Sequence, residues 1–234
     1  PRTLPPEPDQ ETVRDTFPVP IKMVTLSTGR RAVIHCRYVG QDYSGRWGNY
    51  FAHALVIPAE NNDVWPIDIA LSAPWKSQLD PGEGETEPAP LPSLSPGSIR
   101  TIPLESLAEF LQSTTHVRLL SAMVRAVFQR TQDARSLVIR ASQAHDAINW
   151  IACLQRAFPL RCQGQLTATT YQSDPAHCLN INGTYGESDF LFNEMERKYQ
   201  FYMFDLLENM HSEVPDIHSE YVDQVVEWMR KDPS

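Results

Sequence analysis

Several features that mark specialised protein classes are missing from this sequence. No apolar run approaches the roughly 20 residues that a membrane-spanning helix needs. No charged-then-apolar leader opens the chain. The cysteines show no CxxC pair and no repeated spacing, which argues against a disulfide framework or a zinc site; they are Cys36, Cys153, Cys162 and Cys178. We therefore expect reduced thiols, no resident metal and a cytoplasmic protein without membrane contact.

Positive charge is also scarce. The 234-residue chain has 20 Lys and Arg against 29 Asp and Glu, which gives a formal net charge of −9. This balance argues against wholesale binding of nucleic acid or anionic membranes. Otherwise the composition, with 41% hydrophobic and 21% charged residues, is that of an ordinary globular protein and assigns no function by itself.

The common catalytic motifs are absent too. There is no GxxxxGKS or GxxxxGKT loop, and no GxGxxG follows a predicted strand. GxSxG and HExxH are also missing. Because no standard phosphate-binding, hydrolase or zinc-protease signal is present, the sequence predicts no cofactor and leaves open whether the chain is an enzyme.

Proline usage divides the chain. Six of the 19 prolines lie in residues 1–20, which predicts an extended arm, and six more lie between Pro81 and Pro103. Residues 80–97 combine prolines and glycines with three glutamates, so we expect a flexible acidic loop there. Residues 21–234 are predicted to form a single mixed α/β domain. The chain opens at Pro1 and stops at Ser234 without an obvious cap, and we expect it to be a piece of a longer protein.

Hydrophobic periodicity predicts three parts within this domain. An antiparallel block opens it, with strands at 21–26, 31–39 and 50–57 and a short strand or edge piece at 64–71. Helices at 104–111 and 116–131 lead to a strand–helix–strand unit between 136 and 171, in which Ser142 is the expected N-cap. A strand at 177–181 and a C-terminal helical pair at 193–210 and 216–231 complete the prediction.

The most unusual local feature is the polar segment RYVGQDYSGRWGNYFAH at residues 37–53. Its glycines permit tight turns, and loops between rigid strands often carry binding residues. Arg46 could clamp a phosphate or carboxylate, Trp47 or Tyr43 could stack a base or cap a peptide, and His53 is the candidate acid or base. The candidate binding residues are Asp42, Tyr43, Arg46, Trp47, Asn49, Tyr50 and His53. The alternative is a structural hairpin whose polar groups satisfy their own backbone.

Three weaker candidates have structural alternatives. Cys36 and His53, on different strands, could meet as a nucleophile and base, or both could be buried strand residues. The segment 169–174, with His177 nearby, could bind a ligand at the end of a strand or form an ordinary Asp-Pro turn. A basic helix stripe could meet an acidic partner or be a solvated face; it comprises Arg118, Arg125 and Arg130, with Arg135 and Arg140 beyond.

Two segments resemble a known family. The run YVGQDYSGRWGNYFAHALVIP resembles the glycine-rich stretch in the N-terminal domain of bacterial GTPase-associated proteins, and NWIACLQRAFPLRCQGQLTATTYQSDP resembles a later tryptophan-containing helix and strand end. The resemblance covers residues 37–58 and 149–175. Such proteins belong to NTP-dependent conflict (defence) systems and are encoded beside a GTPase or other NTPase. The resemblance implies that Gly45, Arg46 and residues 48–53 follow the family pattern, and it supplies no reaction.

Two functional hypotheses follow. The first is an interaction or adaptor domain of a bacterial defence system, which contacts a GTPase or other NTPase through residues 43–53 and an exposed helix face. The second is an enzyme that processes nucleotides or nucleic acid, with Arg46 on phosphate and His53 as acid or base; a nucleotide sensor without turnover is its variant.

Overall fold

The computed structural model describes residues 17–41, 44–58, 64–78, 99–175, 179–185, 190 and 197–231. The expected acidic loop at 80–97 and all but the last residues of the expected arm at 1–20 lie outside the described residues.

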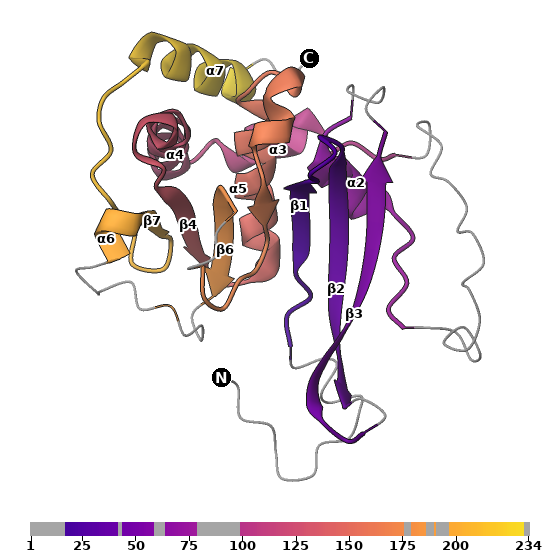
Figure 1. Ribbon diagram of the computed structural model, residues 1–234. Coiled ribbons are helices and arrows are strands. Elements are labelled where there is room, and N and C mark those ends of the chain that lie inside the picture. The colour runs from indigo at the N-terminus through magenta and orange to yellow at the C-terminus, as the bar shows by residue number, and fades with distance from the viewer. Residues whose placement is uncertain are drawn as a thin grey trace.

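One mixed sheet runs through the described chain (Figure 1). Its eight strands lie in the order β3-β2-β1-β5-β6-β4-β7-β8. Neighbours from β3 to β5 pair antiparallel, the pairs β5–β6, β6–β4 and β4–β7 are parallel, and β8 returns antiparallel. The strands are β1 (Ile21–Thr25), β2 (Arg31–Gln41), β3 (Trp47–Ile57), β4 (Ser136–Ala141), β5 (Ala168–Thr169), β6 (Ile181–Tyr185), β7 (Phe201–Asp205) and β8 (Met210–His211).

Helices bury the apolar stripes that the sequence predicts. The helices are α2 (Pro66–Ser72), α3 (Leu104–Phe110), α4 (Thr114–Asp133), α5 (Ala144–Arg156), α6 (Arg197–Gln200) and α7 (Ser219–Lys231), with a 3₁₀ turn at Leu160–Gln165. Helices α4 and α5 pack on the parallel strands, and α2 packs on β1 and β2. The amphipathic α7 lies over α4 and α3 at the top of Figure 1, with Val222, Val226 and Met229 buried.

Strand alternation explains how the parallel half buries both of its faces. Leu137 and Ile139 of β4 point into the main core beneath the helices. Val138, between them, joins a smaller cluster on the opposite face with Phe190 and Phe201. The buried run of β4 is therefore apolar at consecutive positions, as a central parallel strand requires.

The mixed α/β class is confirmed, with the helices at 104–111 and 116–131 and the strand at 136–140 close to their predicted places. The strand–helix–strand unit also exists as β4–α5–β5, although β6 lies between its two strands. Helix α5 begins after Gln143 rather than Ser142, whose hydroxyl donates to Asp146 Oδ2 (2.5 Å). The second strand of that unit, expected to end at Tyr171, is confined to β5, and the strand expected at 177–181 begins only at Ile181.

Two predictions of local structure are wrong. Residues 64–71, expected as a strand, contain helix α2, which Pro66 opens from its first position because its missing N–H costs nothing there. The expected C-terminal helical pair is reduced to one full helix, α7. Residues 201–205 of the other form strand β7, in which Tyr202 and Phe204 face the main core while Phe201 and Met203 face the opposite cluster. Because both faces of the sheet are covered at this position, the segment forms a strand despite the helical spacing of its aromatic residues.

Candidate functional site

The predicted loop is the end of the long β2–β3 hairpin, which extends past the other strands in Figure 1. Gly45 and Gly48 have φ of +80° and +102°, a backbone region that favours glycine. Arg46 Nε donates to Ser44 Oγ (2.9 Å) across the turn. Trp47 and Tyr50 are 48% and 55% exposed, and Asn49 is exposed beside them. Asp42 and Tyr43 lie outside the described residues.

Aromatic contacts brace this hairpin end. The Tyr38 ring packs on Phe17 and Tyr50, with centroids 4.2 and 5.2 Å away. The Tyr38 hydroxyl accepts a hydrogen bond from the Gly48 N–H (3.3 Å). Partial burial is the main cause that raises the pKa of Tyr50, and the neighbouring Tyr38 raises it further. The hairpin end therefore presents Trp47 and Tyr50 from a supported backbone, as an interaction surface requires.

His53 occupies a different environment. It lies directly across from His35, is only 8% exposed, and both imidazoles pack on Trp75 with centroids 5.2 Å away. Its Nδ1 accepts a hydrogen bond from the Lys76 N–H (3.0 Å), while its buried Nε2 has no partner among the described residues. Burial lowers the pKa of both histidines; Lys76 adds to the effect at His53, and His53 adds to it at His35. The neutral form of both rings is therefore favoured.

The structure does not bring Arg46 and His53 together. They are seven positions apart along an extended chain, which corresponds to roughly 20 Å. The expectation that Cys36 and His53 could meet is wrong, because Cys36 pairs with Ala52 and faces the other side of the sheet. Burial also raises the pKa of Cys36, which opposes thiolate formation.

The segment at 169–174 has structural partners. Thr169 and Thr170 are buried; the Thr170 hydroxyl oxygen accepts from the Ile21 N–H (3.0 Å), and the Thr169 hydroxyl donates to the Tyr171 carbonyl (2.9 Å). Asp174 lies 3.7 Å from Arg197. These contacts favour an ordinary turn over a ligand site in this segment. His177 lies outside the described residues.

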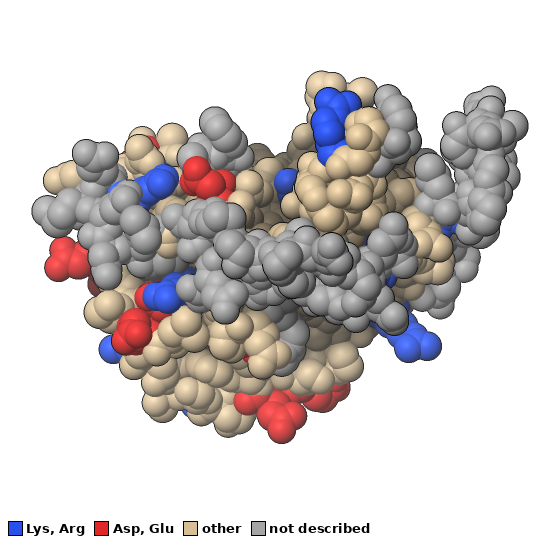
Figure 2. Space-filling model, turned by 90° about the horizontal axis from the view of Figure 1, so that it is seen from below, with Lys and Arg blue, Asp and Glu red and all other residues tan. Residues whose placement is uncertain are grey.

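The basic stripe is likewise engaged within the fold. Arg125 of α4 forms ion pairs with Asp216 (3.1 Å), just before α7, and with Asp223 (3.7 Å) in α7. Arg140 pairs with the buried Asp205 at 2.8 Å. On the face seen in Figure 2, the Lys, Arg, Asp and Glu of the described residues are scattered in small groups separated by uncharged surface. That distribution does not form the broad basic patch that phosphate backbones require.

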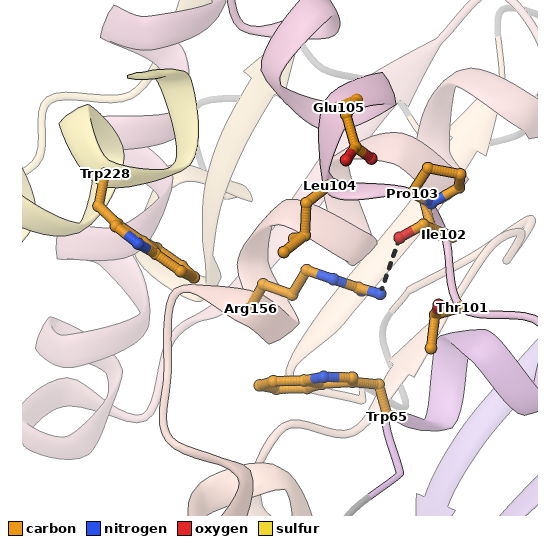
Figure 3. Close-up of a pocket in the computed structure, with 8 residues that line it drawn as sticks. All are labelled: Trp65, Thr101, Ile102, Pro103, Leu104, Glu105, Arg156 and Trp228. Carbon is orange, nitrogen blue, oxygen red and sulfur yellow. Dashed lines mark hydrogen bonds between the residues drawn. The ribbon is translucent and has the colours of Figure 1, made fainter. Parts of the chain in front are cut away.

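A pocket of about 470 Å³ is the feature that sequence reasoning missed (Figure 3). It is lined by Trp65, Thr101, Ile102, Pro103, Leu104, Glu105, Arg156 and Trp228. Behind it, the fully buried Asp68 accepts hydrogen bonds from Arg156 Nη2 at Oδ1 (2.9 Å) and Oδ2 (3.1 Å), and from the Ile102 N–H (3.0 Å). The only sequence signals were single charges in apolar surroundings, Asp68 within VWPIDIAL and Arg156 at the end of α5.

Three further findings concern the described residues. None of their helices combines the length and apolarity required to cross a bilayer. No group of three or more His, Cys, Asp or Glu side chains among them is arranged to hold a metal ion. The three cysteines in this part of the chain are free thiols.

Two models of known protein families match the chain. Residues 1–94 match the model for GTPase-associated protein 1, N-terminal domain type 2, and residues 107–208 match the model for the middle domain of the same protein. The chain belongs to the GTPase-associated protein 1 family. This confirms the resemblance seen in residues 37–58 and 149–175.

A mycobacterial protein is also similar. The "Putative ESX-1 scaffolding and assembly protein SaeB" of Mycolicibacterium smegmatis (strain MKD8) is 30% identical over 191 residues, which cover 78% of this chain and 22% of that protein. The chain thus spans about a fifth of that relative. No solved structure is significantly similar to the chain.

The two family matches meet within one sheet. Strand β1 of the N-terminal match pairs with β5 of the middle match, Met23 opposite Ala168, and Asp68 of the first binds Arg156 of the second. We call this β1–β5 seam with the Asp68–Arg156 pair the junction. The pocket lies at the junction, because its lining includes Trp65 of the first match, Arg156 of the second and residues 101–105 between them; Trp228, beyond both matches, completes it.

Proposed function

We propose that this chain is an adaptor module which holds a GTPase or another NTPase component through the β2–β3 hairpin end. The observation that carries the proposal is the pair of exposed rings, Trp47 and Tyr50, on a hairpin braced by Tyr38. Exposed aromatic side chains on a supported backbone are typical anchors of protein interfaces, because they bury much area at little entropic cost.

The comparisons support a protein partner rather than a reaction. The family is named for its association with a GTPase, and the similar mycobacterial protein is named as a scaffolding and assembly protein. Assignment to a bacterial NTP-dependent defence system and to the cytoplasm is part of the proposal. An enzyme or nucleotide sensor built on Arg46 and His53 is less well supported, because Arg46 lies in the hairpin turn and His53 lies seven positions further along the chain, within β3.

The test is a binding measurement with purified proteins. The 234-residue chain is immobilised, and the GTPase or other NTPase encoded beside its gene is applied in the GDP-bound, GTP-bound and nucleotide-free forms. We expect saturable binding that weakens at least about tenfold in a Trp47→Ala, Tyr50→Ala double variant, as for interface anchors. Tyr199→Ala is the matched control, because it removes an aromatic ring that is 73% exposed in another part of the molecule.

Binding that is equal in the double variant and in the parent would place the partner elsewhere and defeat the proposal. Calorimetry with nucleotides alone separates the sensor hypothesis. A nucleotide that binds without any partner, and whose binding is lost in Arg46→Ala, would favour the sensor over the adaptor.

A further inference from the structure

Arg156, one of the residues that line the pocket at the junction, carries a buried donor without a hydrogen-bond partner among the described residues. The Arg156 side chain is 4% exposed, and its Nη2 binds Asp68 and approaches the Ile102 carbonyl (3.5 Å). Its Nη1 is buried and has no hydrogen-bond partner among the described residues. A buried donor left unpaired costs free energy, so an acceptor brought to this guanidinium would be favoured.

The charge of Arg156 is already balanced. Asp68 is fully buried and contacts the guanidinium through both carboxylate oxygens. A second full negative charge would gain little there, and Glu105 lies in the lining of the same pocket. The acceptor that fits is therefore a neutral oxygen, such as a peptide carbonyl, rather than a phosphate or a carboxylate.

Two tryptophans also line this pocket. In Figure 3 the indoles of Trp65 and Trp228 reach toward Arg156 from different sides. The guanidinium carbon lies 5.5 Å from the Trp65 ring centroid, and Trp228 of α7 is 42% exposed at the opening. Pro103 and Leu104 complete an apolar lining, and the volume of about 470 Å³ is within the range of ligand pockets.

We propose that this pocket binds a proline-containing segment of a protein partner, in extended polyproline conformation. Such a segment offers compact apolar rings to the tryptophans and carbonyl acceptors to Arg156, while its prolines bring no N–H groups that would need acceptors. Aromatic-lined grooves bind proline-rich peptides for these reasons. Glu105 at the pocket favours a Lys or Arg next to the prolines.

The proposal is independent of the hairpin partner, and its test uses another ligand. A display library of random decapeptides is panned against the 234-residue chain, with a Trp228→Ala variant as the counter-selection. We expect the enriched peptides to contain closely spaced prolines beside Lys or Arg. Titrated by calorimetry, they should bind at least about tenfold more weakly to Trp228→Ala, as for an aromatic anchor.

Two variants keep this test decisive. Trp47→Ala removes a tryptophan of similar exposure outside the pocket, and it should bind the enriched peptides as the parent does. Glu105→Gln should reduce the preference for basic residues beside the prolines while leaving proline binding in place. Thermal melting of each variant establishes that it is folded.

Three outcomes would overturn the proposal. These are the absence of enrichment, enriched peptides that lack proline, and equal binding to the parent and Trp228→Ala. A fourth is binding of AMP or GMP that requires Trp228 while no peptide binds, since it would identify the occupant as a nucleobase. A defect of Trp47, Tyr50 variants in GTPase binding would be a separate result, because it concerns the other site.

Discussion

The hairpin end and the junction differ in how the sequence builds them. The hairpin end is made of residues within one continuous stretch, braced by Tyr38, and its backbone hydrogen bonds are those of β2 and β3. The junction combines segments that are far apart, with Asp68 and Arg156 separated by 88 positions. Local construction lets the hairpin vary without unfolding the protein. Construction from distant parts makes the junction a point on which the whole fold depends.

Removal of Asp68 should have the largest effect. Asp68→Ala leaves the buried Arg156 guanidinium without its counter-charge, and breaking a buried pair in this way costs about 3–5 kcal/mol of unfolding free energy. Urea denaturation followed by circular dichroism measures this cost. The matched control is Glu227→Ala, which removes an exposed carboxylate that binds Arg230 and Lys231 on α7 and should leave the denaturation midpoint nearly unchanged.

A double variant sharpens this prediction. Asp68→Leu combined with Arg156→Met replaces the buried pair by apolar side chains of similar size, and it should recover most of the stability lost in Asp68→Ala. If Asp68→Ala were as stable as the parent, the view of the junction as the critical contact would fail.

Gly183 of β6 should also be a sensitive position. A Cβ built there would lie 2.3 Å from the Thr170 carbonyl oxygen and 3.2 Å from Ala147 Cβ. That carbonyl cannot retreat freely, because the Thr170 N–H is bonded to Ile21 across the seam and the Gln172 N–H is bonded to Gly183. We expect Gly183→Ala to lose about 2–3 kcal/mol in urea denaturation through overpacking.

A second glycine provides the control for this experiment. At Gly164 the nearest atom to a built Cβ is Thr25 Oγ1 at 3.9 Å, an ordinary contact. Gly164→Ala should therefore change stability by no more than about 0.5 kcal/mol. Equal losses at both positions would show that the close approach of β6 to Thr170 does not limit the fold.

Acidification tests the base of the hairpin, where His35 and His53 lie on Trp75. Their pKa values in the folded protein are below the unfolded value near 6.5, so the unfolded chain binds more protons in this range. Their contribution to stability is complete above about pH 6.5 and is lost as the pH falls below it. A protonated His53 can no longer accept the Lys76 N–H, and it adds charge beside His35, Arg37 and Lys76.

The measurement is the unfolding free energy between pH 7.5 and 5.5. His53→Gln offers an amide oxygen to the Lys76 N–H but does not titrate, so its stability should fall less steeply than that of the parent. An identical slope in the two proteins would mean that His53 is not responsible for the loss.

The elements that could be predicted from the sequence are those whose hydrophobic pattern lies within one continuous segment. The hairpin, the apolar stripes of α4, α5 and α7, and the buried strand β4 were predictable because each is encoded within one segment. The errors arose where distant contacts decide. Residues 201–205 have helical spacing of aromatic side chains, yet both faces of the sheet are covered there, and a strand results. The pocket was missed because no local motif joins Trp65, Arg156 and Trp228.

Substitution at the hairpin end should have the smallest effect on stability. Trp47 is half exposed at the turn, so we expect Trp47→Ala to stay within about 0.5 kcal/mol of the parent in urea denaturation. Tyr38→Ala removes a buried ring that contacts Phe17 and Tyr50 and should cost about 3 kcal/mol. Because Trp47 is half exposed and Tyr38 is buried, the two variants distinguish a ring that is available for binding from a ring that stabilises the hairpin. If Trp47→Ala were as destabilising as Tyr38→Ala, the exposed ring would be part of the hairpin's own packing, and its role as a binding anchor would lose its physical basis.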